Sequence, residues 1–225
     1  EYVAKMVEIC REVKRVLKED GTFWLNLGDT YSAARWSSGK GQPMNKGKDL
    51  HRAGEETESR ESGLPPKNLV GIPWRVALAL QADGWILRQD IIWAKPNPMP
   101  ESVTDRCTKS HEYIFLLVKN SNYYFDNEAI KENSTSQVRD RTRKIGEGQG
   151  SEIGTKGNAG NDGNRNKRSV WTITTKPYPE AHFATFPSDL IVPMIKAGCP
   201  EKGIVFDPFM GSGTTAYVAR QLGRN

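Results

Sequence analysis

The sequence predicts an α/β fold, in which an open and mostly parallel sheet carries helices on both faces and an antiparallel hairpin at its edge. Three observations lead to this prediction. Helical and strand-like patterns alternate along the 225 residues. A strand pattern at 203–206 runs through a glycine-rich turn into a helix. Two apolar segments, 111–118 and 123–125, are joined so tightly that they must run in opposite directions.

The N-terminal part supplies the first predicted helix and strand. Apolar side chains recur at helical spacing, and Asp20-Gly21 then ends the helix. These side chains are Val3, Met6, Val7, Cys10, Val13 and Leu17. The segment Thr22–Leu27 is β-rich and largely apolar, which predicts a buried strand. Gly28-Asp29-Thr30-Tyr31 follows it, where open α/β sheets bind their ligands.

The rest of the chain repeats this alternation. The further predicted helices are Pro73–Ala82, Pro187–Ala197 and Thr214–Leu222, and the further strands are Trp85–Trp93, His111–Val118, Tyr123–Phe125 and Gly203–Phe206. Lys95–Pro100 is too rich in proline for helix or sheet. We expect one domain over residues 1–225, because no internal repeat or second core pattern is present.

Two polar stretches interrupt the alternation. Residues 32–63 are rich in glycine, lysine, serine and glutamate and have no hydrophobic period, which predicts a mobile loop insertion. Residues 132–168 are glycine-rich and basic, which predicts a second mobile insertion and a candidate target-recognition region. A solvated loop is the alternative interpretation of the second stretch.

The composition indicates which kinds of partner, metal site and membrane segment the chain is expected to have. The net charge of +5 and the pI of about 9.1 favour a polyanionic partner. Cys10, Cys107 and Cys199 form no CxxC pair, so we expect free thiols in a reducing cytosol and no zinc site. His51, His111 and His182 are scattered, which indicates no metal or catalytic triad. No apolar run is long enough to cross a bilayer, and no signal-peptide pattern is present.

The segment Ile204–Thr215 (IVFDPFMGSGTT) is the most informative, because glycines and a helix N-terminus together favour a bound ligand. A P-loop is discounted because no lysine follows Gly213. Gly211, Gly213 and Ala216 fit a dinucleotide pattern, but its acid about 20 residues later would lie beyond the last residue. For S-adenosylmethionine, Asp207 would meet the amino group and Pro208-Phe209 would form an apolar wall. The alternative to a ligand-binding loop is an ordinary turn between a strand and a helix.

DPFMGSGTT resembles the cofactor loop of DNA amino-methyltransferases of the N4-cytosine and N6-adenine type. Five other segments resemble that family in the expected order: Asn26–Tyr31, Trp93–Pro100, Ser110–Phe115, Lys167–Trp171 and Phe186–Leu190. The cofactor loop comes last, which resembles the permuted beta class whose catalytic half comes first. The resemblance covers nearly all of the chain except the two polar stretches. It implies a Rossmann-like, S-adenosylmethionine-dependent methyltransferase sheet.

The family's catalytic tetrapeptide, (Asp/Ser/Asn)-Pro-Pro-(Tyr/Phe), is absent from the sequence. Pro65-Pro66 does not replace it, because Leu64 precedes it and Lys67 follows it. The catalytic residues are therefore unknown. Glu1 already lies in a helical pattern and Asn225 follows one closely, so both ends look truncated. We expect a fragment of a longer protein, with the tetrapeptide upstream of Glu1.

The resemblance implies transfer of a methyl group from S-adenosylmethionine to the exocyclic amine of cytosine (N4) or adenine (N6) in duplex DNA, with the base flipped out of the helix. No metal is required. The implied cofactor-binding residues are Phe186, Pro187, Phe206, Asp207, Pro208, Phe209, Gly211, Ser212, Gly213 and Thr214. Core packing is the alternative role for Phe186.

On the DNA side, Asn26 and Asp29 would support catalysis, and capping of the following turn is the alternative role for Asp29. The implied DNA-binding residues are Lys95, Asn97, Arg139, Arg141, Arg143 and Lys167. A proline-stiffened connector is the alternative role for Lys95 and Asn97. Trp36 and Trp171 would stack on bases or lie buried in the core.

The expected partners are double-stranded DNA, a second copy of the chain and a cognate restriction endonuclease, in the cytoplasm of a prokaryote or a phage-infected cell. Two other functions stay open. One is an RNA methyltransferase, and the other is a catalytically incomplete remnant that binds cofactor or DNA. The sequence does not distinguish cytosine from adenine and does not reveal the recognised site.

Overall fold

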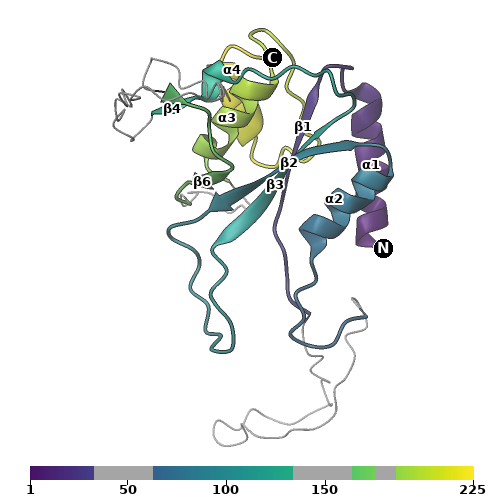
Figure 1. Ribbon diagram of the computed structural model, residues 1–225, viewed down its shortest axis with the longest axis vertical. Coiled ribbons are helices and arrows are strands. Elements are labelled where there is room, and N and C mark those ends of the chain that lie inside the picture. The colour runs from purple at the N-terminus through teal and green to yellow at the C-terminus, as the bar shows by residue number, and fades with distance from the viewer. Residues whose placement is uncertain (33–62, 134–163, 176–185) are drawn as a thin grey trace, which may run out of the picture.

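The computed structural model describes residues 1–32, 63–133, 164–175 and 186–225. A sheet lies between two pairs of helices, α1 and α2 on one face and α3 and α4 on the other (Figure 1). The elements are α1 (Tyr2–Val16), β1 (Thr22–Leu27), α2 (Ile72–Ala82), β2 (Ile86–Ala94), β3 (His111–Val118), the 3-10 turn η1 (Glu128–Ile130), β4 (Glu132–Asn133), β5 (Asn164–Arg165), β6 (Val170–Thr172), α3 (Ser188–Gly198) and α4 (Thr214–Gln221).

The main sheet has the strand order β1-β3-β2-β6. Strands β1 and β2 both run antiparallel to β3, which lies between them, and β6 runs parallel to β2. Strands β1, β2 and β6 therefore point the same way, and their last residues lie at one edge of the sheet, which we call the carboxyl edge. Leu27 at this edge pairs with Tyr113 near the start of β3.

The α/β class is confirmed, but the strand pairing differs from the prediction. We predicted a mostly parallel sheet with a hairpin at its edge, whereas two of the three ladders in the described main sheet are antiparallel. The reason is the position of β3, which pairs on both sides. Its residues 114–118 are all buried, and such a continuous apolar run is typical of a strand covered on both faces.

Two short predicted strands are not strands in the structure. The segment 123–125 bonds to the turn before β1 instead of to a strand, since Tyr124 donates its N–H to the carbonyl of Asp20 at 2.8 Å. The segment 203–206 pairs with Asn225 through two backbone hydrogen bonds in the pattern of parallel strands. Asn225 donates to Gly203 and accepts from Val205, both at 2.8 Å.

Helices α1 and α2 cover one face because their apolar side chains recur on one side. Met6, Cys10 and Val13 of α1 pack with Val76, Ala77 and Leu80 of α2 over Leu25, Trp85, Phe115 and Leu117 of the sheet side. Pro73 occupies the first turn of α2, where its missing N–H leaves no helical bond unmade.

Helix α3 covers the other face together with α4. Leu190, Ile191, Met194 and Ile195 of α3 pack with Val218 and Ala219 of α4 against Ile91, Trp93, Ile114 and Trp171. The last residue of α3, Gly198, approaches β1 so closely that an added Cβ would lie 2.2 Å from Oγ1 of Thr22. The end of α3 is therefore fixed beside the start of β1.

Candidate functional site

The glycine loop, residues 206–214, leads into the N-terminus of α4. Gly211 and Gly213 have φ angles of 53° and 82°, a region that side chains disfavour. Gly213 is the N-cap of α4, and no side chain caps this helix. The N–H groups of the first turn, with their partial positive charge, are thus left for a polar ligand.

Asp207 holds this loop in shape. Its Oδ1 accepts the backbone N–H of Phe209 at 2.9 Å, and its Oδ2 accepts the hydroxyl of Thr215 at 2.6 Å. A carboxylate oxygen can accept more than one hydrogen bond, so Asp207 retains capacity for a ligand's amino group. Thr215, which the sequence did not single out, is buried in the first turn of α4.

Large apolar side chains are exposed around the loop. Phe206 and Phe209 are 62% and 58% exposed, and the neighbouring Met210 and, within α4, Tyr217 are exposed as well. Grouped apolar exposure of this kind marks a surface that a ligand or another element covers. Phe186 instead packs against the α3–α4 core, and Pro187 is buried as the N-cap of α3.

The loop lies toward the carboxyl edge of the sheet. Oγ1 of Thr22, at the start of β1, donates to the carbonyl of Gly198 at the end of α3. The chain then turns at 199–202, so the extended segment 203–206 must run back toward the edge at which β1 ends. In such folds ligands bind at this edge.

Asn26 and Asp29 are both engaged in backbone bonds at the carboxyl edge. Nδ2 of Asn26 donates to the carbonyl of Tyr113 at 3.0 Å. Oδ1 of Asp29 accepts the N–H groups of Thr30, Gly71 and Ile72 at 2.9–3.0 Å. The bond to Thr30 supports the predicted alternative, capping of the following turn. Asp29 also caps α2 across 42 residues of sequence, which was not predicted.

Lys95 and Asn97 hold the proline-rich segment rather than projecting freely from it. Lys95, 19% exposed, forms an ion pair with Glu112 and lies 4.2 Å from the centre of the Trp93 ring. Asn97 donates to the carbonyl of Thr175 at 3.0 Å and accepts its N–H at 2.9 Å. These contacts favour the connector role, and contact with a base stays a prediction.

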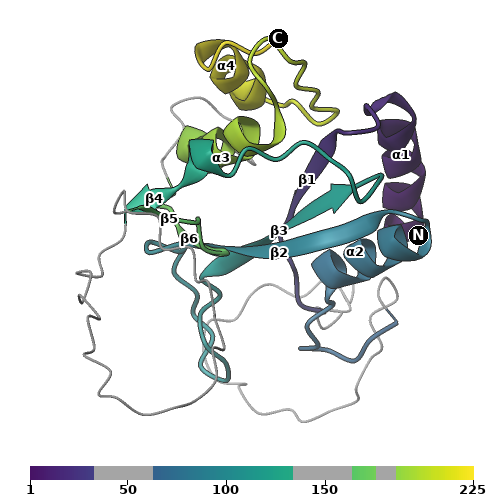
Figure 2. The same cartoon turned by 45° about the horizontal axis from the view of Figure 1, so that its top comes forward.

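The connection between β2 and β3, residues 95–110, extends beyond the carboxyl edge (Figure 2). It docks on the chain leaving β1. The guanidinium of Arg106 pairs with Glu101 at 2.5 Å and stacks on Tyr31 at 4.1 Å. Lys67 pairs with Asp105 at 2.7 Å. Both ends of the stretch 33–62 thus meet this connection, although those residues themselves lie outside the described part.

Lys109 lies just before β3 at the same edge. Its Nζ is buried and has no hydrogen-bond partner among the described residues. Burial lowers the pKa of Lys109, while the carboxylates of Asp29 and Glu112 oppose that effect. An ammonium group withdrawn from water without a partner is energetically costly.

The ends of the second polar stretch form a short clip. Strands β4 and β5 pair antiparallel, and Glu132 accepts from Arg165 at 3.0 Å and from Arg168 at 2.7 Å. Nζ of Lys167 lies 5.1 Å from the ring centre of Trp171, a buried residue whose Nε1 donates to the carbonyl of Arg168. The packing role of Trp171 is the one observed. Arg139, Arg141, Arg143, Trp36, His51 and His182 lie outside the described residues.

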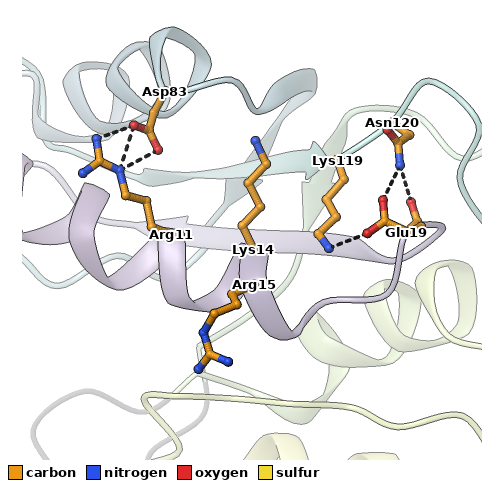
Figure 3. A pocket seen from close by; sticks show the side chains of 7 residues that line it. All are labelled: Arg11, Lys14, Arg15, Glu19, Asp83, Lys119 and Asn120. Atoms are coloured by element: carbon orange, nitrogen blue, oxygen red, sulfur yellow. Dashed lines mark hydrogen bonds and ion pairs between the residues drawn. The ribbon is translucent and has the colours of Figure 1, made fainter.

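A shallow cavity of about 640 Å³ lies at the opposite edge, where β1 and β2 begin (Figure 3). Its charged side chains already have partners, since Arg11 pairs with Asp83, Lys119 with Glu19, and Lys14 with the carbonyl of Gly84. The cavity lacks glycines and apolar side chains that would hold a cofactor. We therefore assign the candidate site to the carboxyl edge.

No helix in the described part of the chain is long and apolar enough to cross a membrane. No group of three His, Cys, Asp or Glu side chains is placed there to hold a metal ion.

The family model of the DNA methylases (N6_N4_Mtase) matches residues 1–225 of the chain. The chain belongs to the DNA methylase family. The segments that suggested this resemblance, DPFMGSGTT above all, thus lie in a chain that matches the family over its whole length.

Two relatives of this DNA methylase chain are named type II methyltransferases. It is 44% identical over 224 residues to the type II methyltransferase M.SmaI of Serratia marcescens, covering all of this chain and 68% of the relative. It is also 44% identical to the type II methyltransferase M.Cfr9I of Citrobacter freundii, of which it covers 65%. The chain thus spans about two thirds of the length of these relatives.

The fold of the DNA methylase chain also matches solved structures. The PvuII DNA methyltransferase (cytosine-N4-specific) superposes with a TM-score of 0.65 at 17% identity, over all of this chain and 64% of the other. A putative DNA modification methylase of Thermus thermophilus, in complex with S-adenosyl-L-methionine, superposes with a TM-score of 0.55 at 19% identity, covering all of this chain and 69% of the other. At these identities the likeness confirms the methyltransferase fold.

Sequence reasoning missed four residues of the candidate site: Glu101, Lys109, Glu112 and Thr215. A signal existed for Glu112, because it is a charge just before the apolar run 113–118, of which 114–118 are buried. Thr215 directly follows the assigned Thr214, but its contact with Asp207 depends on the loop conformation. Nothing in the local sequence of Lys109 predicts that its ammonium is buried.

Proposed function

We propose that the protein transfers a methyl group from S-adenosylmethionine to the exocyclic amine of cytosine (N4) or adenine (N6) in duplex DNA. The observation that carries this proposal is the glycine loop. It combines uncapped N–H groups of α4, the Asp207 carboxylate and exposed apolar side chains at the edge where ligands bind. Membership of the DNA methylase family supports the same reaction.

The residues of the loop fit this cofactor in charge and polarity. The bound cofactor supplies an electrophilic methyl group on a sulfonium centre. Asp207 would accept the amino group of the methionine moiety, and the N–H groups of the first turn of α4 would donate to its carboxylate. Phe206 and Phe209 would cover the apolar parts, which would remove their exposed area from water. Pro208, Gly211, Ser212, Gly213 and Thr214 would shape the remaining walls.

On the DNA side, the proposal uses the carboxyl edge and the clip of the second polar stretch. The segment 95–98 is fixed by the Lys95–Glu112 pair and the Asn97–Thr175 bonds, which would orient it beside a flipped base. Lys167 and Arg139, Arg141 and Arg143 would contact phosphates. The net charge of +5 supports a polyanionic substrate.

The relatives shape the rest of the proposal. Because they are type II methyltransferases of bacteria, we propose a bacterial cytoplasmic protein that works beside a cognate restriction endonuclease and acts on one recognition site. A homodimer belongs to the same proposal. The RNA methyltransferase and the catalytically incomplete remnant are less well supported, because the family model is that of the DNA methylases and the relatives are named type II methyltransferases.

The test is methyl transfer by the intact protein. Unmethylated bacteriophage DNA is incubated with methyl-labelled S-adenosylmethionine, digested to nucleosides and analysed by mass spectrometry. The proposal predicts N4-methylcytosine or N6-methyladenine, and the product names the target base. A parallel reaction with RNA of the same sequence serves as the control. Methylated RNA without methylated DNA would contradict the proposal.

A further inference from the structure

The Nζ of Lys109 is the one buried ammonium group in the described residues without a hydrogen-bond partner. Three carboxylates contribute to its surroundings, those of Asp29, Glu112 and Glu101, and Lys95 contributes a second positive charge. An ammonium group has three donors, and leaving them unused in a buried place is unfavourable. A ligand that accepts from Lys109 would relieve that cost.

The neighbouring carboxylates are already engaged elsewhere. Oδ1 of Asp29 accepts three backbone N–H groups at the start of α2. Glu112 pairs with Lys95 through Oε1, and Oε2 of Glu101 accepts from Arg106. Oε2 of Glu101 also accepts the backbone N–H of Lys109 at 3.3 Å. Each carboxylate balances charge near Lys109, but none accepts a hydrogen bond from its Nζ. The structure therefore holds a donor in place beside fixed negative charges.

The location of this donor is the carboxyl edge. Lys95, directly after β2, donates its backbone N–H to the carbonyl of Ser110, the residue after Lys109. Glu112 opposes Gly28 closely enough that an added Cβ on the glycine would lie 3.9 Å from its carboxylate. Lys109 thus lies among the ends of β1 and β2 and the start of β3, toward which the glycine loop also runs.

We propose that Lys109 is a binding residue for the extrahelical target base, and that its amino group donates a hydrogen bond to a ring nitrogen or carbonyl oxygen of that base. This inference rests on the proposed DNA methyltransferase function. A phosphate fits less well, because Asp29, Glu101 and Glu112 would repel a second anion in a place of low dielectric. A neutral base offers acceptors without that repulsion.

Substitution Lys109→Met separates a binding role from a structural one. Methionine keeps the unbranched side chain up to the position of Cε and removes the unpaired charge, so the midpoint of thermal unfolding should stay equal or rise. The loss of one hydrogen bond to the base should lower kcat/KM for DNA by about 10–100-fold, with unchanged affinity for S-adenosylmethionine. Lys67→Met, which removes an exposed cation of the same region, is the matched control and should behave as wild type.

The experiment uses the intact protein and begins with wild-type methyl transfer to bacteriophage DNA. Absence of product from the wild type would remove the proposed function and this inference together. Wild-type kinetics in the Lys109→Met variant, or a fall in its unfolding midpoint, would overturn the inference alone.

A second experiment compares binding to two duplexes. Mapping the methylated positions identifies the recognition site, and duplexes with this site are then prepared with either the target base or an abasic residue at the methylated position. If the Lys109→Met variant binds the base-containing duplex more weakly than the wild type but binds the abasic duplex equally well, the contact with the base is supported. An equal loss on both duplexes would assign Lys109 to the phosphate and overturn the proposal.

Discussion

The carboxylate of Asp207 accepts the hydroxyl of Thr215 at 2.6 Å and so joins the glycine loop to the first turn of α4. The same carboxylate accepts the N–H of Phe209, so one side chain fixes both sides of the loop. The loop is therefore already ordered before a cofactor binds, so binding costs less conformational entropy than it would with a flexible loop.

Replacing Thr215 by valine tests this arrangement. The substitution keeps the branched shape but removes the donor, so Asp207 loses one of its two bonds. We expect the affinity for S-adenosylmethionine to fall by about 10-fold, which is the low end for a hydrogen bond to a charged group. Isothermal titration of the intact protein measures the change. Thr215→Ser keeps the hydroxyl and should retain most of the affinity; equal losses in both variants would contradict the role of this bond.

Asp29 gives a prediction on stability. Its Oδ1 satisfies the first N–H groups of α2, and loss of such a cap costs about 1–2 kcal/mol. Asp29→Ala should lower the free energy of unfolding by that amount in urea titrations. Asp29→Asn keeps an acceptor oxygen and should lose less. An alanine variant as stable as the wild type would show that the cap is dispensable.

The clip at Glu132 should depend on pH. Burial raises the pKa of Glu132, but the hydrogen bonds and charges of Arg168 and Arg165 outweigh it and hold the pKa below its usual value. Because the folded pKa is depressed, the contribution of the clip is complete above the unfolded pKa, about 4.3, and is lost as the pH falls through the lower folded value.

Hydrogen exchange of β4 and β5 measures this dependence. Protection corrected for the intrinsic exchange rate should be constant from neutral pH down to about 4.3 and fall below it. Glu132→Gln should show weaker protection at neutral pH and no such step. A step of the same size in the glutamine variant would assign it to another group.

The three cysteines should react in order of exposure. Cys107 is exposed, whereas Cys10 and Cys199 are buried. Burial raises the pKa of the Cys10 thiol to about 11 and raises that of Cys199, which leaves little reactive thiolate near neutral pH. Maleimide labelling of the folded protein, followed by peptide mass spectrometry, should therefore modify Cys107 first. Rapid labelling of Cys10 would contradict the packing of α1 against α2.

Local patterns in the sequence were enough for the class of fold and for most elements. The helical spacing of Met6, Cys10 and Val13 predicted the buried face of α1, and Pro73 predicted the start of α2. The central place of β3 was also encoded, in the uninterrupted apolar run 114–118. We treated that run as part of an edge hairpin because the close spacing of 123–125 suggested a partner strand.

The candidate site was less predictable, because its contacts join residues far apart in the chain. The glycine loop was readable since its residues are contiguous. The cap of α2 by Asp29 spans 42 residues, and the pair of Asn97 with Thr175 spans 78. Local sequence contains no trace of either. The burial of Lys109 likewise arises only when the β2–β3 connection folds onto the end of β1.

The central claim is that the glycine loop binds S-adenosylmethionine for methyl transfer, and Phe209 tests it most directly. Phe209 is 58% exposed, so Phe209→Ala should leave the unfolding midpoint nearly unchanged. Tyr2, 50% exposed on α1 on the opposite face of the sheet, provides the matched control Tyr2→Ala.

The measurement is calorimetric titration of the intact wild type and both variants with S-adenosylmethionine. The account predicts binding by the wild type and by Tyr2→Ala, and an affinity lower by about 10-fold or more for Phe209→Ala, because burial of a phenylalanine side chain stabilises a complex by about 1.5–3 kcal/mol. Wild-type affinity in Phe209→Ala would contradict the assignment of this loop to the cofactor.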